Sequence, residues 1–123
     1  MKLYFCEKCG ALYANVNEVG HCTPVCCGQE TEALKAGTTD AALEKHVPQV
    51  TREGNQVHVQ VGSVLHPMTE EHWIDFIAVV QGKKVQYVSL TPQDEPKASF
   101  VVEDGPVEVY EHCNLHGLWK AEA

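Results

Sequence analysis

The longest apolar run in the sequence is Trp73-Ile74-Asp75-Phe76-Ile77-Ala78-Val79-Val80, and it decides the fold class. It is rich in β-branched and aromatic residues, which favour strands. The turn Gln81-Gly82-Lys83-Lys84 follows, and Val85, Tyr87 and Leu90 supply the apolar positions of a second strand. This stretch therefore predicts an antiparallel hairpin, the longest in the chain.

Two shorter hairpins are predicted on either side of it. The turn signals are Glu53-Gly54-Asn55 and Glu103-Asp104-Gly105-Pro106, each between short β-prone segments. Several short strands with turns between them indicate a mainly β, antiparallel sandwich, preceded by one helical turn at 41–45 after a loop at 37–40. The strands of the two hairpins are expected at 47–52 with 57–61 and at 98–102 with 107–111.

Composition and charge exclude several classes of function. The hydrophobic fraction of 44% is that of a folded protein, and no apolar run approaches the ~20 residues that cross a membrane. The net charge is -8, and the nine Lys and Arg residues are scattered, which argues against nucleic acid as a partner. No apolar signal segment precedes Cys6, so we expect a soluble cytoplasmic protein. An anionic substrate would need a local positive charge.

The cysteines indicate a metal site near the N-terminus. Five of the six fall in the first 27 residues, where disulfides would brace only a small corner of the chain. Four thiolates spaced C-x2-C-x16-C-C suit a tetrahedral all-sulfur site, which selects zinc or iron. The ligands of this first site are expected to be Cys6, Cys9, Cys26 and Cys27.

The adjacent pair Cys26-Cys27 is the unusual half of the motif. Neighbouring side chains diverge, so both reach one metal only with a strained backbone, and a zinc ribbon ordinarily repeats C-x2-C. The pair therefore favours iron, with a structural zinc knuckle as the alternative. For Cys22 we expect a buried inert thiol; a substitute ligand or an oxidation-prone thiol is the other interpretation.

A second set of metal ligands is spread over the rest of the chain. All its members lie at expected strand ends or loops, where a sandwich gathers functional groups. Four imidazoles and one thiolate exceed what a closed tetrahedral zinc site uses, and they suit a square-pyramidal iron with one open position. The candidates are His46, His66, His72, Cys113 and His116.

Five further residues receive structural interpretations. His58 alternates with valines and is expected to face solvent, whereas His112 should point to the strand face opposite Cys113 and is a poor ligand candidate. Trp73 and Trp119 are expected to pack around the site. Met68 is expected to fill the core or a loop.

These motifs in this order resemble desulfoferrodoxin, the two-iron class of superoxide reductases, over nearly the whole chain. Each motif is weak alone and specific only in combination. The stretch 20–24 departs from the family by carrying a cysteine where a Gly-rich turn is usual. The matching segments are Glu44-Lys45-His46-Val47-Pro48, His66-Pro67-Met68, Glu71-His72-Trp73 and Cys113-Asn114-Leu115-His116-Gly117-Leu118-Trp119.

The resemblance implies a desulforedoxin-like iron domain at 1–36 and an immunoglobulin-like β-sandwich with the catalytic iron at 37–123. It implies that the four histidines are equatorial ligands and that Cys113 is the axial sulfur. It gives Glu44 as the carboxylate that closes the resting ferric site and Lys45 as the cation beside the open position. Two iron ions per chain follow, one at each site.

The implied activity is one-electron reduction of superoxide to hydrogen peroxide, with a rubredoxin-like electron donor and a homodimeric assembly. A superoxide dismutase would use similar metal chemistry and is one alternative. A one-electron carrier that uses only the four-cysteine iron, or a zinc-stabilised binding module, leaves the five ligands of the second site without a purpose.

Overall fold

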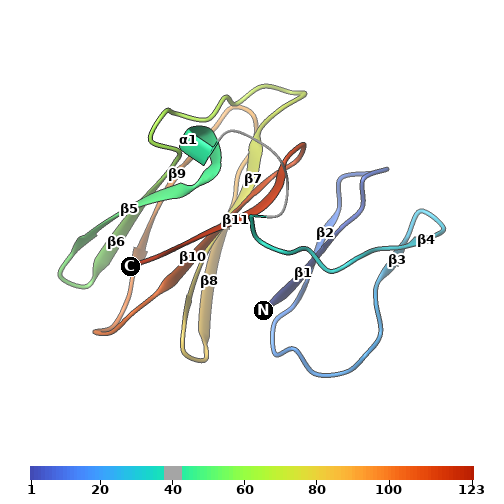
Figure 1. Ribbon diagram of the computed structural model, residues 1–123, viewed down its shortest axis with the longest axis horizontal. Coiled ribbons are helices and arrows are strands. Elements are labelled where there is room, and N and C mark those ends of the chain that lie inside the picture. The colour runs from blue at the N-terminus through green and yellow to red at the C-terminus, as the bar shows by residue number, and fades with distance from the viewer. Residues whose placement is uncertain (38–42) are drawn as a thin grey trace. The chain divides into compact units, whose positions relative to one another are not determined.

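The computed structural model describes residues 1–37 and 43–123, which form two compact units, Met1–Lys35 and Ala36–Ala123 (Figure 1). The expected loop positions 38–40 and the first two residues of the expected helical turn, 41 and 42, lie outside the described residues. The helix α1 spans Leu43–His46. Within the described part of the chain, no helix has the length and apolar character that a membrane span requires.

The first unit is built from two small antiparallel ribbons. Strand β1 (Lys2–Phe5) pairs with β2 (Leu12–Asn15), and β3 (Val25–Cys26) pairs with β4 (Gln29–Glu30). Among its described residues, the buried apolar residues are Leu3, Tyr4 and Cys6, and the side chain of Met1 is also 2% exposed. This is too little apolar surface to hold a unit of this size, so the fold needs a metal at its centre.

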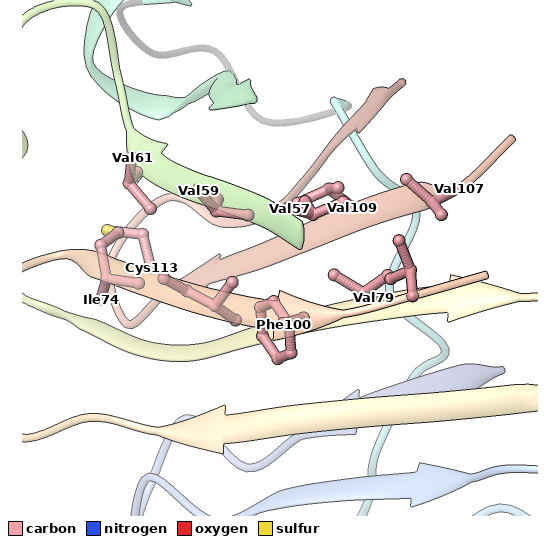
Figure 2. Close-up of a cluster of buried hydrophobic side chains, with 11 residues drawn as sticks. Val57, Val59, Val61, Ile74, Val79, Phe100, Val107, Val109 and Cys113 are labelled. Carbon is pink, nitrogen blue, oxygen red and sulfur yellow. The ribbon is translucent and has the colours of Figure 1, made fainter. Parts of the chain in front are cut away.

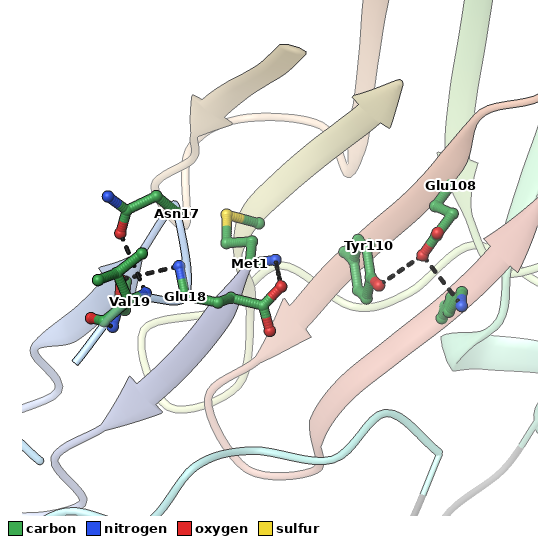
Figure 3. Close-up of polar contacts among 8 residues, drawn as sticks. Met1, Asn17, Glu18, Val19, Glu108 and Tyr110 are labelled. Atoms are coloured by element: carbon green, nitrogen blue, oxygen red, sulfur yellow. Dashed lines mark hydrogen bonds and ion pairs between the residues drawn. The ribbon is translucent and has the colours of Figure 1, made fainter. Parts of the chain in front are cut away.

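Local hydrogen bonds close the turn after β2. The Glu18 amide donates to the Asn15 side chain at 3.1 Å, and the Val19 amide donates to the side-chain oxygen of Asn17 at 3.3 Å. The N-terminal ammonium of Met1 pairs with the Glu18 carboxylate at 3.0 Å (Figure 3). Hydrogen bonds and ion pairs at exposed positions add little stability each, so a bound metal would be the main constraint on this unit.

In its described residues, the second unit is mainly β, as the apolar run predicted. One sheet has the strand order β11-β10-β7-β8 and the other β5-β6-β9, with all pairings antiparallel. The first two predicted hairpins are confirmed as β5 with β6 and β7 with β8. The immunoglobulin-like sandwich stays a prediction. The strands are β5 Pro48–Glu53, β6 Gln56–Val61, β7 Ile74–Gln81, β8 Lys84–Ser89, β9 Lys97–Val101, β10 Glu108–Cys113 and β11 Gly117–Glu122.

Both sheets of this unit contribute to one hydrophobic cluster. Figure 2 shows the valines of β6 directed toward side chains of β7 and β10. Cys113 lies at one end of the cluster next to Ile74, its partner in the register between β10 and β7. Ile77 and Val109 are fully buried, and Met68 packs against the cluster as expected. The second unit thus has a core that needs no metal to form.

The third predicted hairpin is wrong. Strand β9 pairs with β6, whereas β10 pairs with β7 and β11, so the turn at 103–106 crosses from one sheet to the other. Side chains from both sheets hold this crossing: Arg52 donates to the carbonyls of Glu103 and Gly105, and the Gln81 side chain pairs with the backbone of Glu103. Strand β11, which pairs with β10, was not anticipated.

Candidate metal centres

The structure brings the four predicted cysteines of the first unit together. Their sulfurs lie within 4.8 Å of one another, and the Sγ atoms of Cys9 and Cys26 are 3.5 Å apart. The first pair is shaped by a tight turn after β1, in which the Gly10 amide donates to the Cys6 carbonyl and the Cys6 amide to the Ala11 carbonyl. Gly10 has a φ of 81°, a conformation that glycine adopts without strain.

The adjacent cysteines need an unusual backbone, as the sequence predicted. Cys27 has a φ of 51°, in the left-handed region that costs an ordinary residue about 1 kcal/mol or more. Gly28 follows at a φ of 77°. This backbone lets Cys26 and Cys27, which are neighbours in the chain, both belong to the sulfur group. A bound metal ion would offset the strain.

The protonation of the sulfurs also fits a cation at their centre. Backbone hydrogen bonding at Cys9 lowers the pKa of Cys6 to about 7. Hydrogen bonding to the sulfur of Cys9, and then to Cys6, raises the pKa of Cys27 to about 12. Four thiols this close cannot all ionise without a positive charge between them, and a metal ion supplies it.

Two residues near the motif differ from the sequence interpretation or were missed by it. Cys22 is exposed and is not part of the sulfur group, so the expectation of a buried thiol is wrong. The Tyr13 hydroxyl donates to the Cys26 sulfur at 3.2 Å, and this hydrogen bond raises the pKa of Tyr13 to about 12. No spacing rule marks Tyr13, because its contact joins β2 to Cys26 on β3, and these strands belong to different ribbons.

The five predicted ligands of the second unit also converge. Their ligand atoms lie within 4.8 Å of one another, although they come from α1, the 62–73 loop, the end of β10 and the turn between β10 and β11. Burial is high for most of the set, since His46 and His66 are each 2% exposed and Cys113 is fully buried.

The four imidazoles form a square. Neighbouring ring centroids are 4.8 Å apart for His46 and His66, 4.6 Å for His66 and His72, 5.0 Å for His72 and His116, and 4.8 Å for His116 and His46. The diagonal between His46 and His72 is longer, at 6.4 Å. A tetrahedral arrangement would make all these separations equal. The square therefore fits four equatorial ligands with Cys113 as a fifth.

The nitrogens at the centre need a cation. His66 Nδ1 lies 2.7 Å from the Pro67 carbonyl, which fixes the proton there and leaves Nε2 as an electron donor. His46 Nε2 lies 3.2 Å from His66 Nε2 and 3.1 Å from His116 Nδ1. His72 Nε2 is buried and has no hydrogen-bond partner among the described residues. A metal ion at this point satisfies all of them.

The burial of the site shifts the pKa of two of its members. Burial, reinforced by the neighbouring imidazoles and only partly offset by the Pro67 carbonyl, lowers the pKa of His66 to about 4, so this ring is neutral and ready to bind metal. Burial raises the pKa of Cys113 to about 11, while the backbone amides of Leu115 and His116 act in the opposite direction. A bound metal would convert this thiol to a thiolate.

A close backbone approach positions α1. Gly62 has a φ of 83°, and any side chain there would collide with the backbone of Glu44, Lys45 and Val64. The Val64 amide donates to the Glu44 carbonyl at 2.9 Å, and the Ser63 hydroxyl donates to the same oxygen at 3.3 Å. The loop after β6 therefore holds the helix that carries His46.

Asn114 connects two ligand-bearing loops. Its side-chain oxygen accepts from the Trp73 amide at 2.9 Å, and its side-chain nitrogen donates to the Glu71 carbonyl at 3.0 Å. Its own amide donates to the Trp73 carbonyl at 3.2 Å. These contacts bracket His72 and tie it to the segment that begins with Cys113 at the end of β10 and includes His116. Spacing had marked the C-x2-H pair but not this role for the residue inside it.

The remaining predicted residues surround the site. Glu44 and Lys45 are exposed on α1, and the charge of Lys45 contributes to the lowered pKa of His72, whose main cause is burial. Glu44 is not part of either ligand group among the described residues. Trp119 stacks on His46 at 5.1 Å and donates to the His116 carbonyl at 3.0 Å, so it packs around the site as expected.

The other polar residues of β6 and β10 stay outside the ligand group. His58 is partly exposed on β6 and contacts Ser99 at 2.8 Å. His112 is buried and pairs with Asp75 at 2.8 Å, away from the ligands. Glu111 is fully buried, and burial raises its pKa well above the usual value. Sequence reasoning missed Glu111.

A mainly β unit with five nitrogen and sulfur ligands, preceded by a four-cysteine unit, defines a class of non-haem metalloproteins. The family model described as Desulfoferrodoxin matches residues 38–122. A desulfoferrodoxin homolog of Archaeoglobus fulgidus is 46% identical over 98% of this chain and 96% of its own length. The desulfoferrodoxin of Nitratidesulfovibrio vulgaris is 44% identical over 99% and 96%.

A solved structure agrees with these relatives. The superoxide reductase from Treponema pallidum matches with a TM-score of 0.76 and 39% identity, covering 98% of this chain and 99% of that one. The chain therefore belongs to the desulfoferrodoxin family.

Proposed function

We propose that this protein is a superoxide reductase that carries out one-electron reduction of superoxide at an iron held by His46, His66, His72, Cys113 and His116. The observation that carries the proposal is the square of four imidazoles with a buried sulfur as fifth donor. A closed zinc site uses four ligands in a tetrahedron, whereas five donors in this arrangement leave a sixth position of iron for a small molecule. The names of the relatives support the same activity.

Bound iron would supply the single electron, and the chain supplies the surroundings. Superoxide takes up one electron and two protons to become hydrogen peroxide. Lys45, exposed beside His72, offers the anion a local attraction on a protein whose net charge is -8. The Cys113 sulfur would donate electron density to the metal, a lever that thiolate ligands also use in haem proteins. Glu44 would close the resting oxidised site.

The first unit would hold the second iron through Cys6, Cys9, Cys26 and Cys27. Zinc is the competing metal, and the strained Cys26-Cys27 pair, together with relatives that match over nearly the whole chain, favours iron. We further propose residues 1–36 and 37–123 as the two functional domains, a rubredoxin-like electron donor, a homodimeric assembly and a cytoplasmic location.

Replacing Lys45 by Ile tests the electrostatic part of the proposal. The second-order rate with pulse-generated superoxide should fall, and its dependence on ionic strength should weaken, because the local cation is gone. Lys83→Ile, which removes another exposed cation from the turn between β7 and β8, is the matched control and should keep the wild-type rate. An unchanged rate in Lys45→Ile would remove this residue from the mechanism.

Oxygen release distinguishes reductase from dismutase. A reductase needs an external electron for every turnover and forms only peroxide, whereas a dismutase returns oxygen as well. Under a superoxide flux with an excess of reduced donor, this protein should release peroxide without matching oxygen. Stoichiometric oxygen evolution would favour the dismutase.

A further inference from the structure

The side chain of Tyr13 belongs to neither ligand group, yet it touches one of them. Tyr13 lies on β2, opposite Tyr4 in the pairing with β1, and it is 37% exposed. Its hydroxyl donates a hydrogen bond of 3.2 Å to the sulfur of Cys26, which lies at the end of β3. The phenol thus joins the first ribbon of the unit to the metal ligand of the second.

We propose that the Tyr13 hydroxyl, by donating to the Cys26 sulfur, raises the reduction potential of the four-cysteine iron. This inference rests on the proposed function, because it requires iron at the first site. Tyr13 is a positioning residue in this scheme: it acts through Cys26 and touches neither superoxide nor the metal.

The direction of the effect follows from charge. Four thiolates with a ferric ion carry one net negative charge, and reduction to the ferrous ion adds a second, part of which resides on sulfur. A donor hydrogen bond stabilises the more negative state more than the less negative one, so it favours reduction. Hydrogen bonds to the sulfurs are among the main levers by which proteins set the potential of iron–sulfur sites.

The surroundings of Cys26 make the hydrogen bond from Tyr13 important for the potential. At Cys6, the backbone amides of Cys9 and Lys8 lower the pKa of the thiol. At Cys26 the described donor from outside the cysteine group is the Tyr13 hydroxyl. The protein also carries a net charge of -8, which opposes any further negative charge. The Tyr13 hydroxyl, which donates to the sulfur, stabilises the added negative charge locally.

The first site is accessible from the surface, so its reduction potential can affect electron transfer from another protein. Cys9 and Cys27 are exposed, so this metal can exchange electrons with another protein at the surface. A higher potential makes the oxidised iron an easier acceptor for an external donor. Tyr13 would then set how readily the first iron is reduced, without changing its ligands.

The test is a redox titration of the full-length iron-loaded protein and its Tyr13→Phe variant, followed through the sulfur-to-iron charge-transfer absorption. The variant keeps the ring and loses only the hydroxyl. We expect the equilibrium constant for reduction to fall about tenfold, which is ~59 mV for a one-electron couple. Tyr87→Phe removes a hydroxyl from an exposed tyrosine of the second unit and should keep the wild-type potential.

A second measurement reports the hydrogen bond itself. Resonance Raman spectra of the iron–sulfur stretch should shift on exchange into deuterated water, and the shift should be smaller in Tyr13→Phe than in wild type and Tyr87→Phe. Equal potentials and equal isotope shifts in Tyr13→Phe and wild type would overturn the inference and leave the proposed function standing. A Tyr13→Phe protein that fails to bind iron would also overturn it, because the hydroxyl would then be needed to assemble the site. A wild-type site filled with zinc would overturn both the inference and the proposed first iron.

Discussion

The two candidate metal centres differ in the size of the hydrophobic core around them. Around the four-cysteine site the strands are two to four residues long, and few apolar side chains are buried, so a bound metal would take the place of a core. Around the imidazole square, strands of up to eight residues enclose a continuous hydrophobic cluster that reaches Cys113 itself. The first site is therefore a condition for its unit to fold. The second site lies in a unit whose hydrophobic core is stable without a metal.

The strongest way to break this comparison is to remove a ligand from the first unit. Cys6→Ala should lose the first metal, and amide hydrogen exchange should show that residues 1–35 lose protection, because their remaining core is too small. The strands β6, β7 and β10 should stay protected. Cys22→Ala, which removes a thiol outside the sulfur group, should keep both metals and all protection. Preserved protection of β1 and β2 in Cys6→Ala would contradict the account.

Truncating the core of the second unit gives the complementary experiment. Ile77 is fully buried between neighbours of the cluster, and Ile77→Ala should lower the free energy of unfolding of this unit by roughly 2–5 kcal/mol. Val101→Ala, at a position 68% exposed, should stay within ~0.5 kcal/mol. Thermal unfolding followed by circular dichroism measures both. A small loss for Ile77→Ala would mean that metal, rather than packing, holds this unit too.

A weaker effect is expected for Asn114, which connects the loops that carry the ligands of the second unit. Asn114→Ala removes the side chain that brackets His72, and residues that orient metal ligands in this way typically contribute about 10–100-fold in metal affinity. Asn114→Asp keeps the acceptor for the Trp73 amide but loses the donor to the Glu71 carbonyl. Its metal affinity should therefore lie between those of the wild type and Asn114→Ala. Competition against a chelator measures the affinity. Equal metal retention in all three proteins would show that the loops are positioned without this residue.

The smallest effect concerns the metal-free protein in acid. His66 has its pKa lowered to about 4 in the folded state, from 6.5 when unfolded, so the unfolded chain binds the extra proton first. The stability that this neutral ring contributes is present above pH 6.5 and is lost as the pH falls toward 4. His66→Gln should therefore flatten the decline of the melting temperature between these values. An identical decline in wild type and variant would assign it to other groups.

Sequence predicted most of the ligand chemistry and the strands that fill the core. The valines of β6 and the run from Ile74 to Val80 are apolar because these strands are buried, so the pattern is visible in the sequence. The cysteine and histidine motifs mark ligand pairs because their members lie within a few residues of each other. The sequence could not show that the turn at 103–106 crosses between sheets, because Arg52 and Gln81 reach it from other strands. Tyr13 was also missed, since its side chain reaches Cys26 from a separate ribbon, and sequence spacing does not show that contact.

The most direct test of the account is electron paramagnetic resonance of natively loaded, oxidised protein before and after addition of cyanide, with the metal content measured alongside. The account predicts two irons per chain with distinct ferric signals. Cyanide should change only the signal of the site that His46, His66, His72, Cys113 and His116 would form. In the oxidised protein only Glu44 would occupy the sixth position of that iron, and a small ligand can displace it, whereas four cysteines fill the other site. Zinc in that site, or a ferric signal there that cyanide leaves unaltered, would contradict the central claim.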